Sequence, residues 1–134
     1  MSLRWYSVIV DCHDVRAQSR WWADVLGWQI IYEAEDEVVV VPPHALDASR
    51  EIPRAERGPG LIFVPVPETK TLKNRLHIDL APAADDDQEA EVRRLESLGA
   101  RRIDIGQGEV TWVVMADPED NEFCVLQALP AGDS

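Results

Sequence analysis

The sequence predicts an α+β fold in which two β-α-β-β-β units follow one another within a single domain. The first observation is that strand-like and helix-like patterns occur in the same order in both halves of the chain. The second is that two dipeptides recur 72 positions apart, Leu26-Gly27 as Leu98-Gly99 and Glu37-Val38 as Glu109-Val110. The third is the length of 134 residues, which suits one domain. A repeat of this kind predicts two sheets, each with a face to cover.

The first half places one helical pattern among four strand-like segments. Residues 14–26 carry apolar side chains at helical spacing, with Asp14 as a suitable N-cap and Gly27 as a suitable end. Runs of apolar, β-prone residues predict strands at 5–12, 28–33, 37–41 and 60–66. Before the last of these strands, residues 42–59 are rich in proline and charge, which predicts a surface loop.

The second half repeats this order. A helix is predicted at 86–98, where Asp85 and Gln88 have the spacing of a capping box and Gly99 ends the pattern. Strands are predicted at 75–80, 100–105, 110–116 and 122–129. We therefore expect a domain over residues 5–128, with unit one at about 5–66, a linker at 67–74, unit two at about 75–128 and a tail at 129–134.

The composition argues against several classes of function. Thirteen basic and 25 acidic residues give a formal net charge of −12 and a pI near 4.5, which disfavours nucleic acids and anionic membranes as partners. No apolar run approaches the roughly 20 residues of a membrane span, and the N-terminal segment lacks the pattern of a signal peptide. Cys12 and Cys124 are too few for a disulfide framework. We expect a cytoplasmic protein.

The paired units and the Asp-Pro-x-x-Asn turn at 117–121 resemble the vicinal oxygen chelate superfamily. That group includes glyoxalase I, extradiol dioxygenases, fosfomycin-resistance transferases and bleomycin-binding proteins. Within it, segments 66–80 and 117–127 are similar to the glyoxalase-like subgroup. The resemblance covers about residues 5–128. It implies that the mixed sheets curve into a groove for a small-molecule ligand, and that two chains pair as a homodimer.

In metal-dependent members of the superfamily, the ligands come from the first and last strand of each unit, usually as His or Glu. The resemblance maps these positions onto Ser7, Val64, His77 and Cys124. A catalytic site needs three or four donors, and this set offers one imidazole and one thiol. We therefore expect no resident metal; if a divalent ion binds, His77 and Cys124 hold it. A shift of register by one or two residues would add other donors: Glu109, Glu122 or His13.

His77 is the candidate catalytic residue, because a histidine in the groove can act as a general base or a hydrogen-bond donor, although a core histidine bonded to a neighbour has the same signature. Asp79 shares the strand face of His77, and Asp11 shares that of Ser7. Cys124 is either a nucleophile or, like most free cysteines, a small buried hydrophobe. The expected pocket lining comprises Ser7, Asp11, Val64, His77, Asp79, Trp112 and Cys124.

Three functions stay open, and the sequence does not decide whether the protein is an enzyme. The first is a glyoxalase-like protein that binds or transforms a small molecule without a full metal site. The second is a divalent-metal-dependent lyase or dioxygenase. The third is antibiotic sequestration of the bleomycin-resistance type, because the net charge of −12 would steer a cationic drug. The basic cluster of Lys70, Lys73 and Arg75 fits either an anionic ligand group or a solvated linker.

Overall fold

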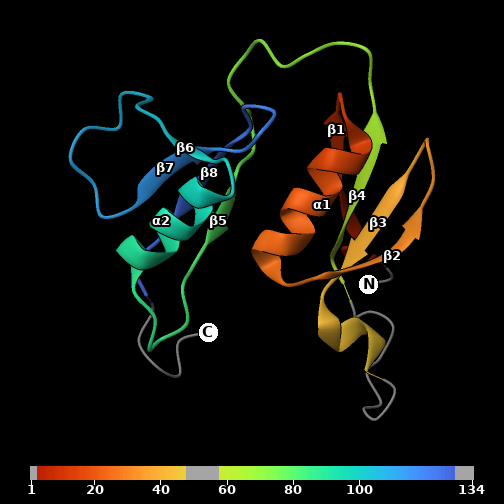
Figure 1. Ribbon diagram of the computed structural model, residues 1–134, viewed down its shortest axis with the longest axis horizontal. Coiled ribbons are helices and arrows are strands. Elements are labelled where there is room, and N and C mark those ends of the chain that lie inside the picture. The colour runs from red at the N-terminus through yellow and green to blue at the C-terminus, as the bar shows by residue number, and fades with distance from the viewer. Residues whose placement is uncertain (1–2, 48–57, 129–134) are drawn as a thin grey trace. The chain divides into compact units, whose positions relative to one another are not determined.

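The computed structural model describes residues 3–47 and 58–128. The chain forms two compact units that divide between Thr69 and Lys70. Each unit contains four strands and one helix in the order β-α-β-β-β (Figure 1). The prediction of an α+β fold made of two such units is confirmed.

The first unit is a four-stranded mixed sheet with one helix. Its elements are β1 (Ser7–Cys12), α1 (Val15–Leu26), β2 (Gln29–Glu33), β3 (Val38–Val41) and β4 (Gly60–Pro65). The strand order is β1-β4-β3-β2. β1 pairs with β4 in parallel, whereas the other two pairs are antiparallel. The last strand of the unit therefore lies beside the first.

The second unit repeats this topology with shorter strands. Its elements are β5 (Ile78–Leu80), α2 (Gln88–Ser97), β6 (Arg101–Arg102), β7 (Val113–Ala116) and β8 (Glu122–Val125). The strand order is β5-β8-β7-β6, again with one parallel pair between the first and last strands. The internal repeat predicted from the sequence thus extends to strand order and direction.

Both helices begin at an aspartate and are followed by a glycine. The carboxylate of Asp14 accepts a hydrogen bond from the backbone N–H of Ala17 at 3.1 Å, which satisfies one free donor of the first turn. Gly27 and Gly99 have φ angles of 66° and 109°, a region that favours glycine and lets the chain leave the helix. The predicted ends of both helices are therefore explained by the same backbone device.

The predicted start of α2 is wrong by two residues. Asp87, not Asp85, is the N-cap, and it accepts a hydrogen bond from the backbone N–H of Ala90 at 3.0 Å. Gln88 makes no capping box, because its side-chain amide donates to the carbonyls of Thr111 and Val125. Three successive aspartates offer equivalent caps, and the attachment of Gln88 to the end of β8 favours the last of them.

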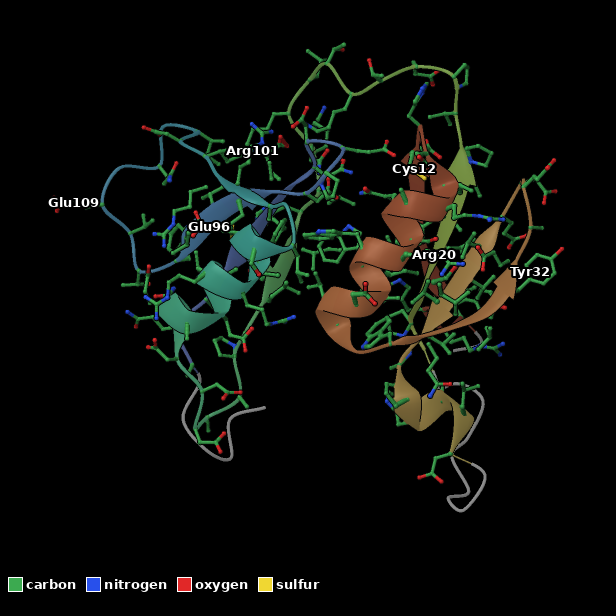
Figure 2. The ribbon with its side chains drawn as sticks, in the orientation of Figure 1. Cys12, Arg20, Tyr32, Glu96, Arg101 and Glu109 are labelled. Carbon is green, nitrogen blue, oxygen red and sulfur yellow. The ribbon has the colours of Figure 1, made fainter. Side chains whose placement is uncertain are left out.

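Each helix covers one face of its own sheet, and ion pairs mark that face. Arg20 of α1 pairs with Glu33 of β2 at 3.0 Å. In the second unit Arg102 of β6 pairs with Glu89 and Glu96 of α2. Figure 2 shows Arg20 and Glu96 on their helices. In the first unit the helix therefore carries the positive partner and the strand the negative one, and in the second unit this arrangement is reversed.

Residues that lie opposite one another on neighbouring strands form rows across each sheet, and one row in each unit identifies the core beneath the helix. The two equivalent rows are Glu33-Val38-Phe63 in the first unit and Arg102-Met115-Phe123 in the second. Phe63 and Phe123 are fully buried. Because neighbouring residues of a strand point to opposite faces, Val64 and Cys124 point away from the helices.

Several predicted strands are shorter in the structure. The strand predicted at 75–80 begins at Ile78, the one at 100–105 is limited to Arg101–Arg102, and the one at 122–129 ends at Val125.

β7 begins at Val113, three residues later than the recurrence of Glu37-Val38 predicts, and Glu109 lies in the loop before it (Figure 2). This loop turns at Gly106 and Gly108, both with positive φ. The two dipeptides therefore have the same spacing without marking the same position relative to their strands. β1 begins at Ser7 rather than at residue 5.

Part of the predicted loop 42–59 is ordered as a short 3-10 helix at Pro43–Leu46. Residues 48–57 of that loop and the predicted tail at 129–134 lie outside the described residues. Among the residues that are described, no helix is long and apolar enough to span a membrane.

Candidate functional site

The two units can be aligned through the hydrogen bonds that follow their parallel strand pairs. The backbone N–H of Val66 donates to the carbonyl of Cys12 at 2.9 Å. The backbone N–H of Leu126 donates to the carbonyl of Leu80 at 2.8 Å. Each bond lies at the end of the parallel ladder of its own unit. The residues that precede the two bonds therefore correspond one to one.

This correspondence assigns each site position a counterpart in the other unit. Two cross-strand pairs match, Asp11–Val64 in the first unit and Asp79–Cys124 in the second. Val64 is therefore the counterpart of Cys124, in line with the sequence analysis. His77 lies two residues before Asp79, and Ile9 lies two residues before Asp11. The counterpart of His77 is therefore Ile9 rather than Ser7.

Three potential metal-binding side chains meet on the second sheet, on the face that points away from α2. They are His77, Asp79 and Cys124, and their ligand atoms all lie within 4.8 Å of one another. His77 Nε2 lies 3.2 Å from Asp79 Oδ1. The imidazole and the carboxylate are 45% and 50% exposed, whereas Cys124 is buried. The cluster thus has a buried thiol and an open side.

The environment of Cys124 keeps the thiol protonated. Burial raises the pKa of Cys124, and the charge of Asp79 and a hydrogen bond with it raise this pKa further. The charge of Lys73 acts in the opposite direction. Because the thiolate is the nucleophilic form, this environment does not favour Cys124 as a nucleophile. A cation bound beside the sulfur would reverse the balance.

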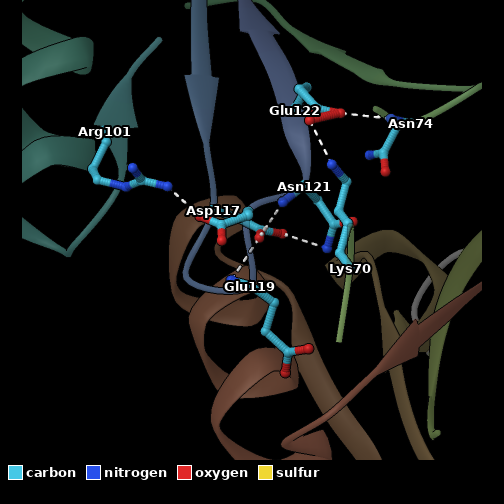
Figure 3. A network of polar contacts seen from close by, with 8 residues as sticks. Lys70, Asn74, Arg101, Asp117, Glu119, Asn121 and Glu122 are labelled. Carbon is cyan, nitrogen blue, oxygen red and sulfur yellow. Dashed lines mark hydrogen bonds and ion pairs between the residues drawn. The ribbon is translucent and has the colours of Figure 1, made fainter. Parts of the chain in front are cut away.

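Glu122 begins β8 on the same face as Cys124, and its carboxylate is engaged at both oxygens (Figure 3). Lys70 Nζ lies 2.6 Å from Oε2, and the backbone N–H of Asn74 donates to Oε1 at 2.6 Å. Burial opposes the charge, but these two bonds outweigh it and lower the pKa of Glu122. The carboxylate therefore serves as an anchor for residues 70–74.

The Asp-Pro-x-x-Asn turn lies directly before β8. The buried carboxylate of Asp117 accepts hydrogen bonds from the backbone N–H groups of Glu119 and Asn121, both at 2.9 Å (Figure 3). Its second oxygen accepts from the Asn121 side chain at 3.2 Å. Asp120 adopts a φ of 69°, which aspartate tolerates better than most residues, and pairs with Arg101.

The other residues predicted for the pocket have different positions. Asp11 lies opposite Val64 and Ser7 lies opposite Gly60, all in the first unit. Trp112 is 40% exposed and lies in the loop before β7, not within a strand as predicted. Of the alternative donors, His13 follows β1 and Glu109 lies in that same loop, whereas Glu122 lies on the face of Cys124 with both carboxylate oxygens engaged.

Sequence reasoning missed two features of this site. Parity placed Asp79 on the face of His77, but only the pairing of β5 with β8 brings its carboxylate opposite Cys124 as a third donor. The basic cluster of the linker is also divided, because Lys70 is paired with Glu122. These two residues are 52 positions apart, and nothing in the local sequence of either indicates the other.

The family comparison covers both units. The model of the glyoxalase-like domain family matches residues 7–126. No curated protein matches the sequence. The matched range includes His77, Asp79 and Cys124.

Solved structures with a similar fold come from several proteins. A glyoxalase/bleomycin resistance protein/dioxygenase family enzyme from Burkholderia phytofirmans PsJN is 17% identical with a TM-score of 0.66, over 95% of this chain and 100% of that one. The fosfomycin resistance protein FosX from Listeria monocytogenes is 11% identical with a TM-score of 0.67, over 96% and 94%. The oxidase ChaP-H2 is 19% identical with a TM-score of 0.62, over all of both chains.

At these identities the structural likeness concerns the fold. A mutant of the Listeria protein was solved with Mn(II) and 1S,2S-dihydroxypropylphosphonic acid, a property of that protein. The family match and the repeated topology agree over nearly the whole length of the chain. The chain therefore belongs to the glyoxalase-like domain family, within the vicinal oxygen chelate superfamily.

Proposed function

We propose that the protein binds and transforms a small oxygen-containing molecule at the His77–Asp79–Cys124 cluster, and that this cluster holds a divalent metal ion. One observation carries the proposal: a nitrogen, an oxygen and a sulfur donor lie within 4.8 Å of one another on one sheet face. From the sequence alone, two donors and no resident metal are expected at this position. Asp79 supplies the third, which is the number of protein ligands in catalytic zinc sites.

The chemistry of the three donors favours a particular class of ion. Thiolate and imidazole suit zinc and similar borderline ions, whereas Mn(II) prefers oxygen. Two anionic donors and a neutral imidazole would balance a dication. A metal bound at the sulfur would displace the thiol proton and offset the negative charge of Asp79. We therefore expect Zn²⁺ to be retained in preference to Mn²⁺.

The residues of the chain divide the work at this site. The exposed sides of His77 and Asp79 leave room for a ligand, while the buried Cys124 closes the opposite side. A bound ion would polarise an oxygen of the ligand as a Lewis acid. Lys73, whose charge reaches the sulfur, adds positive potential beside the site and favours a ligand that carries negative charge.

A second candidate is a metal-independent reaction at the same residues. It is favoured by the 3.2 Å contact between His77 Nε2 and Asp79 Oδ1, in which the carboxylate orients the imidazole. An imidazole held in this way can act as a general base toward a bound ligand. The sequestration hypothesis rests on net charge alone, and like homodimer formation it stays a prediction.

The test is metal retention by the purified protein. The apoprotein is offered Zn²⁺, Ni²⁺, Mn²⁺ and Fe²⁺ in turn, passed through gel filtration and analysed for metal content. We expect one zinc per chain, lost in His77→Ala and Cys124→Ser. The matched control is His44→Ala, which removes an exposed histidine of the first unit and should leave the zinc content unchanged.

Failure to retain any ion would contradict the metal proposal and leave the metal-independent candidate. That candidate is then tested by nuclear magnetic resonance with acetate, pyruvate and methylphosphonate as probes. Ligand-induced shifts of the His77 ring signals, absent in Asp79→Asn, would support it. Shifts confined to residues outside the cluster, or no shifts, would contradict it.

A further inference from the structure

A short segment, residues 70–77 and here named the strap, leads into β5 and carries His77 at its end. It is attached to β8 through the carboxylate of Glu122. Glu122 binds the strap at its first residue, Lys70, and at its fifth, Asn74, by two contacts of 2.6 Å (Figure 3). The side chains of Lys70 and Glu122 are only 18% and 10% exposed, so water competes weakly for these bonds.

The strand ladder alone does not hold His77. The first residue of β5 that pairs with β8 is Ile78, opposite Phe123, so His77 lies just outside the ladder. On its other side, the nearest anchor is the N–H of Asn74, three residues earlier. The backbone of His77 is therefore held between two attachments to β8, and one of them is Glu122.

The geometry points to Glu122 as a positioning residue: by anchoring the strap to the strand that carries Cys124, it sets the separation of the His77 imidazole from the Cys124 sulfur. This inference rests on the proposed function for the importance of His77. Glu122 and Cys124 are two residues apart on one strand face. A change in the strap would therefore move His77 relative to both Asp79 and Cys124.

Comparison with the first unit supports a role of Glu122 that is specific to the second unit. Counting from the matched pair of Val64 and Cys124, the counterpart of Glu122 is Ile62. An isoleucine there can make neither contact, and the counterpart of His77 is the apolar Ile9. The carboxylate anchor thus occurs in the unit that contains the three-donor cluster, and apolar residues fill both positions where that cluster is lacking.

The experiment uses the full metal-free chain and compares Glu122→Ala, Glu122→Gln and Lys70→Met with Glu89→Gln. Glu89 is a matched control, because it is a carboxylate of the same unit that pairs with Arg102 on the helix-covered face. Two signals are followed by nuclear magnetic resonance: hydrogen exchange of the Asn74 amide and the ring signals of His77. A third measurement is the dissociation constant for Zn²⁺.

In Glu122→Ala we expect Asn74 exchange to accelerate by about tenfold or more, His77 ring signals to shift and broaden, and zinc affinity to fall by about tenfold. Glu122→Gln keeps an acceptor for Asn74 and should recover most of these properties, while Lys70→Met should give an intermediate result. Glu89→Gln should resemble the wild type in all three. If Glu122→Ala is poorly folded, Lys70→Met and Glu122→Gln still decide the question.

The inference is overturned if the His77 ring signals of folded Glu122→Ala or Lys70→Met coincide with those of the wild type. A loss of global stability with unchanged His77 signals would likewise assign Glu122 a purely structural role. Failure of the wild type to bind zinc would contradict the proposed metal function. It would not affect the exchange and ring-signal measurements, so the two failures are distinguishable.

Discussion

The two units have the same strand order and the same register, yet they carry different chemistry. At three matched positions the first unit has Ile9, Asp11 and Val64, where the second has the three donors. One carboxylate alone is a common surface group, whereas a carboxylate beside an imidazole and a thiol is a potential site. The comparison teaches that the hydrogen-bonded ladder determines where a site can form, and that two substitutions within it decide whether one does.

The largest expected effect on stability comes from removing the equivalent core side chains of the two units. Phe63→Ala and Phe123→Ala remove matched, fully buried side chains. Each should reduce the free energy of unfolding by about 3–5 kcal/mol, measured by urea denaturation with circular dichroism. If only one of the two variants is destabilised, the cores do not carry equal weight and the equivalence of the units fails.

The turn before β8 distinguishes the units, and Asp117→Ala tests its importance. The substitution leaves two backbone N–H groups and one side-chain amide without their acceptor. We expect a loss of about 2–4 kcal/mol in the same denaturation assay, with Asp117→Asn recovering part of it. A loss below about 0.5 kcal/mol would mean that the turn is held by other contacts.

The contacts of Glu122 with the strap should make the stability of the second unit depend on pH. The pKa of Glu122 is lower in the folded than in the unfolded chain, so its ionised form stabilises the fold at neutral pH. That contribution, about 1–3 kcal/mol, is lost as the pH falls through the folded pKa, below the ordinary carboxyl range. Denaturation between pH 7 and 3 should show a smaller acid loss in Glu122→Gln than in the wild type, and equal losses would contradict this.

The smallest effect concerns the reversed ion pairs between helix and sheet. Arg20→Met and Arg102→Met remove side chains that are 56% and 43% exposed, so each should change stability by only about 0.2–1 kcal/mol. Both differences should shrink further in 0.5 M salt, roughly three times the physiological ionic strength. A larger effect in one unit would show that this unit depends on charge for holding its helix.

Much of the fold could be predicted because the signals are local. The aspartate at the start of α1, the glycines after both helices and the alternation within strands each depend on neighbours a few residues away. The start of β7 was missed because the loop before it is longer than in the first unit, and Glu109-Val110 imitates a strand start. Asp87 displaced Asp85 as a cap because Gln88 is held by the distant Val125.

The site could be predicted only in part, for a related reason. Resemblance to a family indicated His77 and Cys124, and strand parity placed Asp79 on the face of His77. Their convergence depends on the pairing of β5 with β8, which joins residues 45 positions apart. The anchor through Glu122 depends on a contact between residues 52 positions apart, and a local pattern carries no information about either.

A metal site confined to the second unit is tested most directly by calorimetric titration of Zn²⁺ into variants changed at matched positions. Cys124→Val gives the second unit the residue of the first, and Asp79→Asn removes the carboxylate. Asp11→Asn makes the same change in the first unit. We predict that the first two variants lose zinc affinity by more than about tenfold, while Asp11→Asn binds one zinc as the wild type does. Equal binding by all four proteins, or no binding by the wild type, would contradict a metal site confined to the second unit.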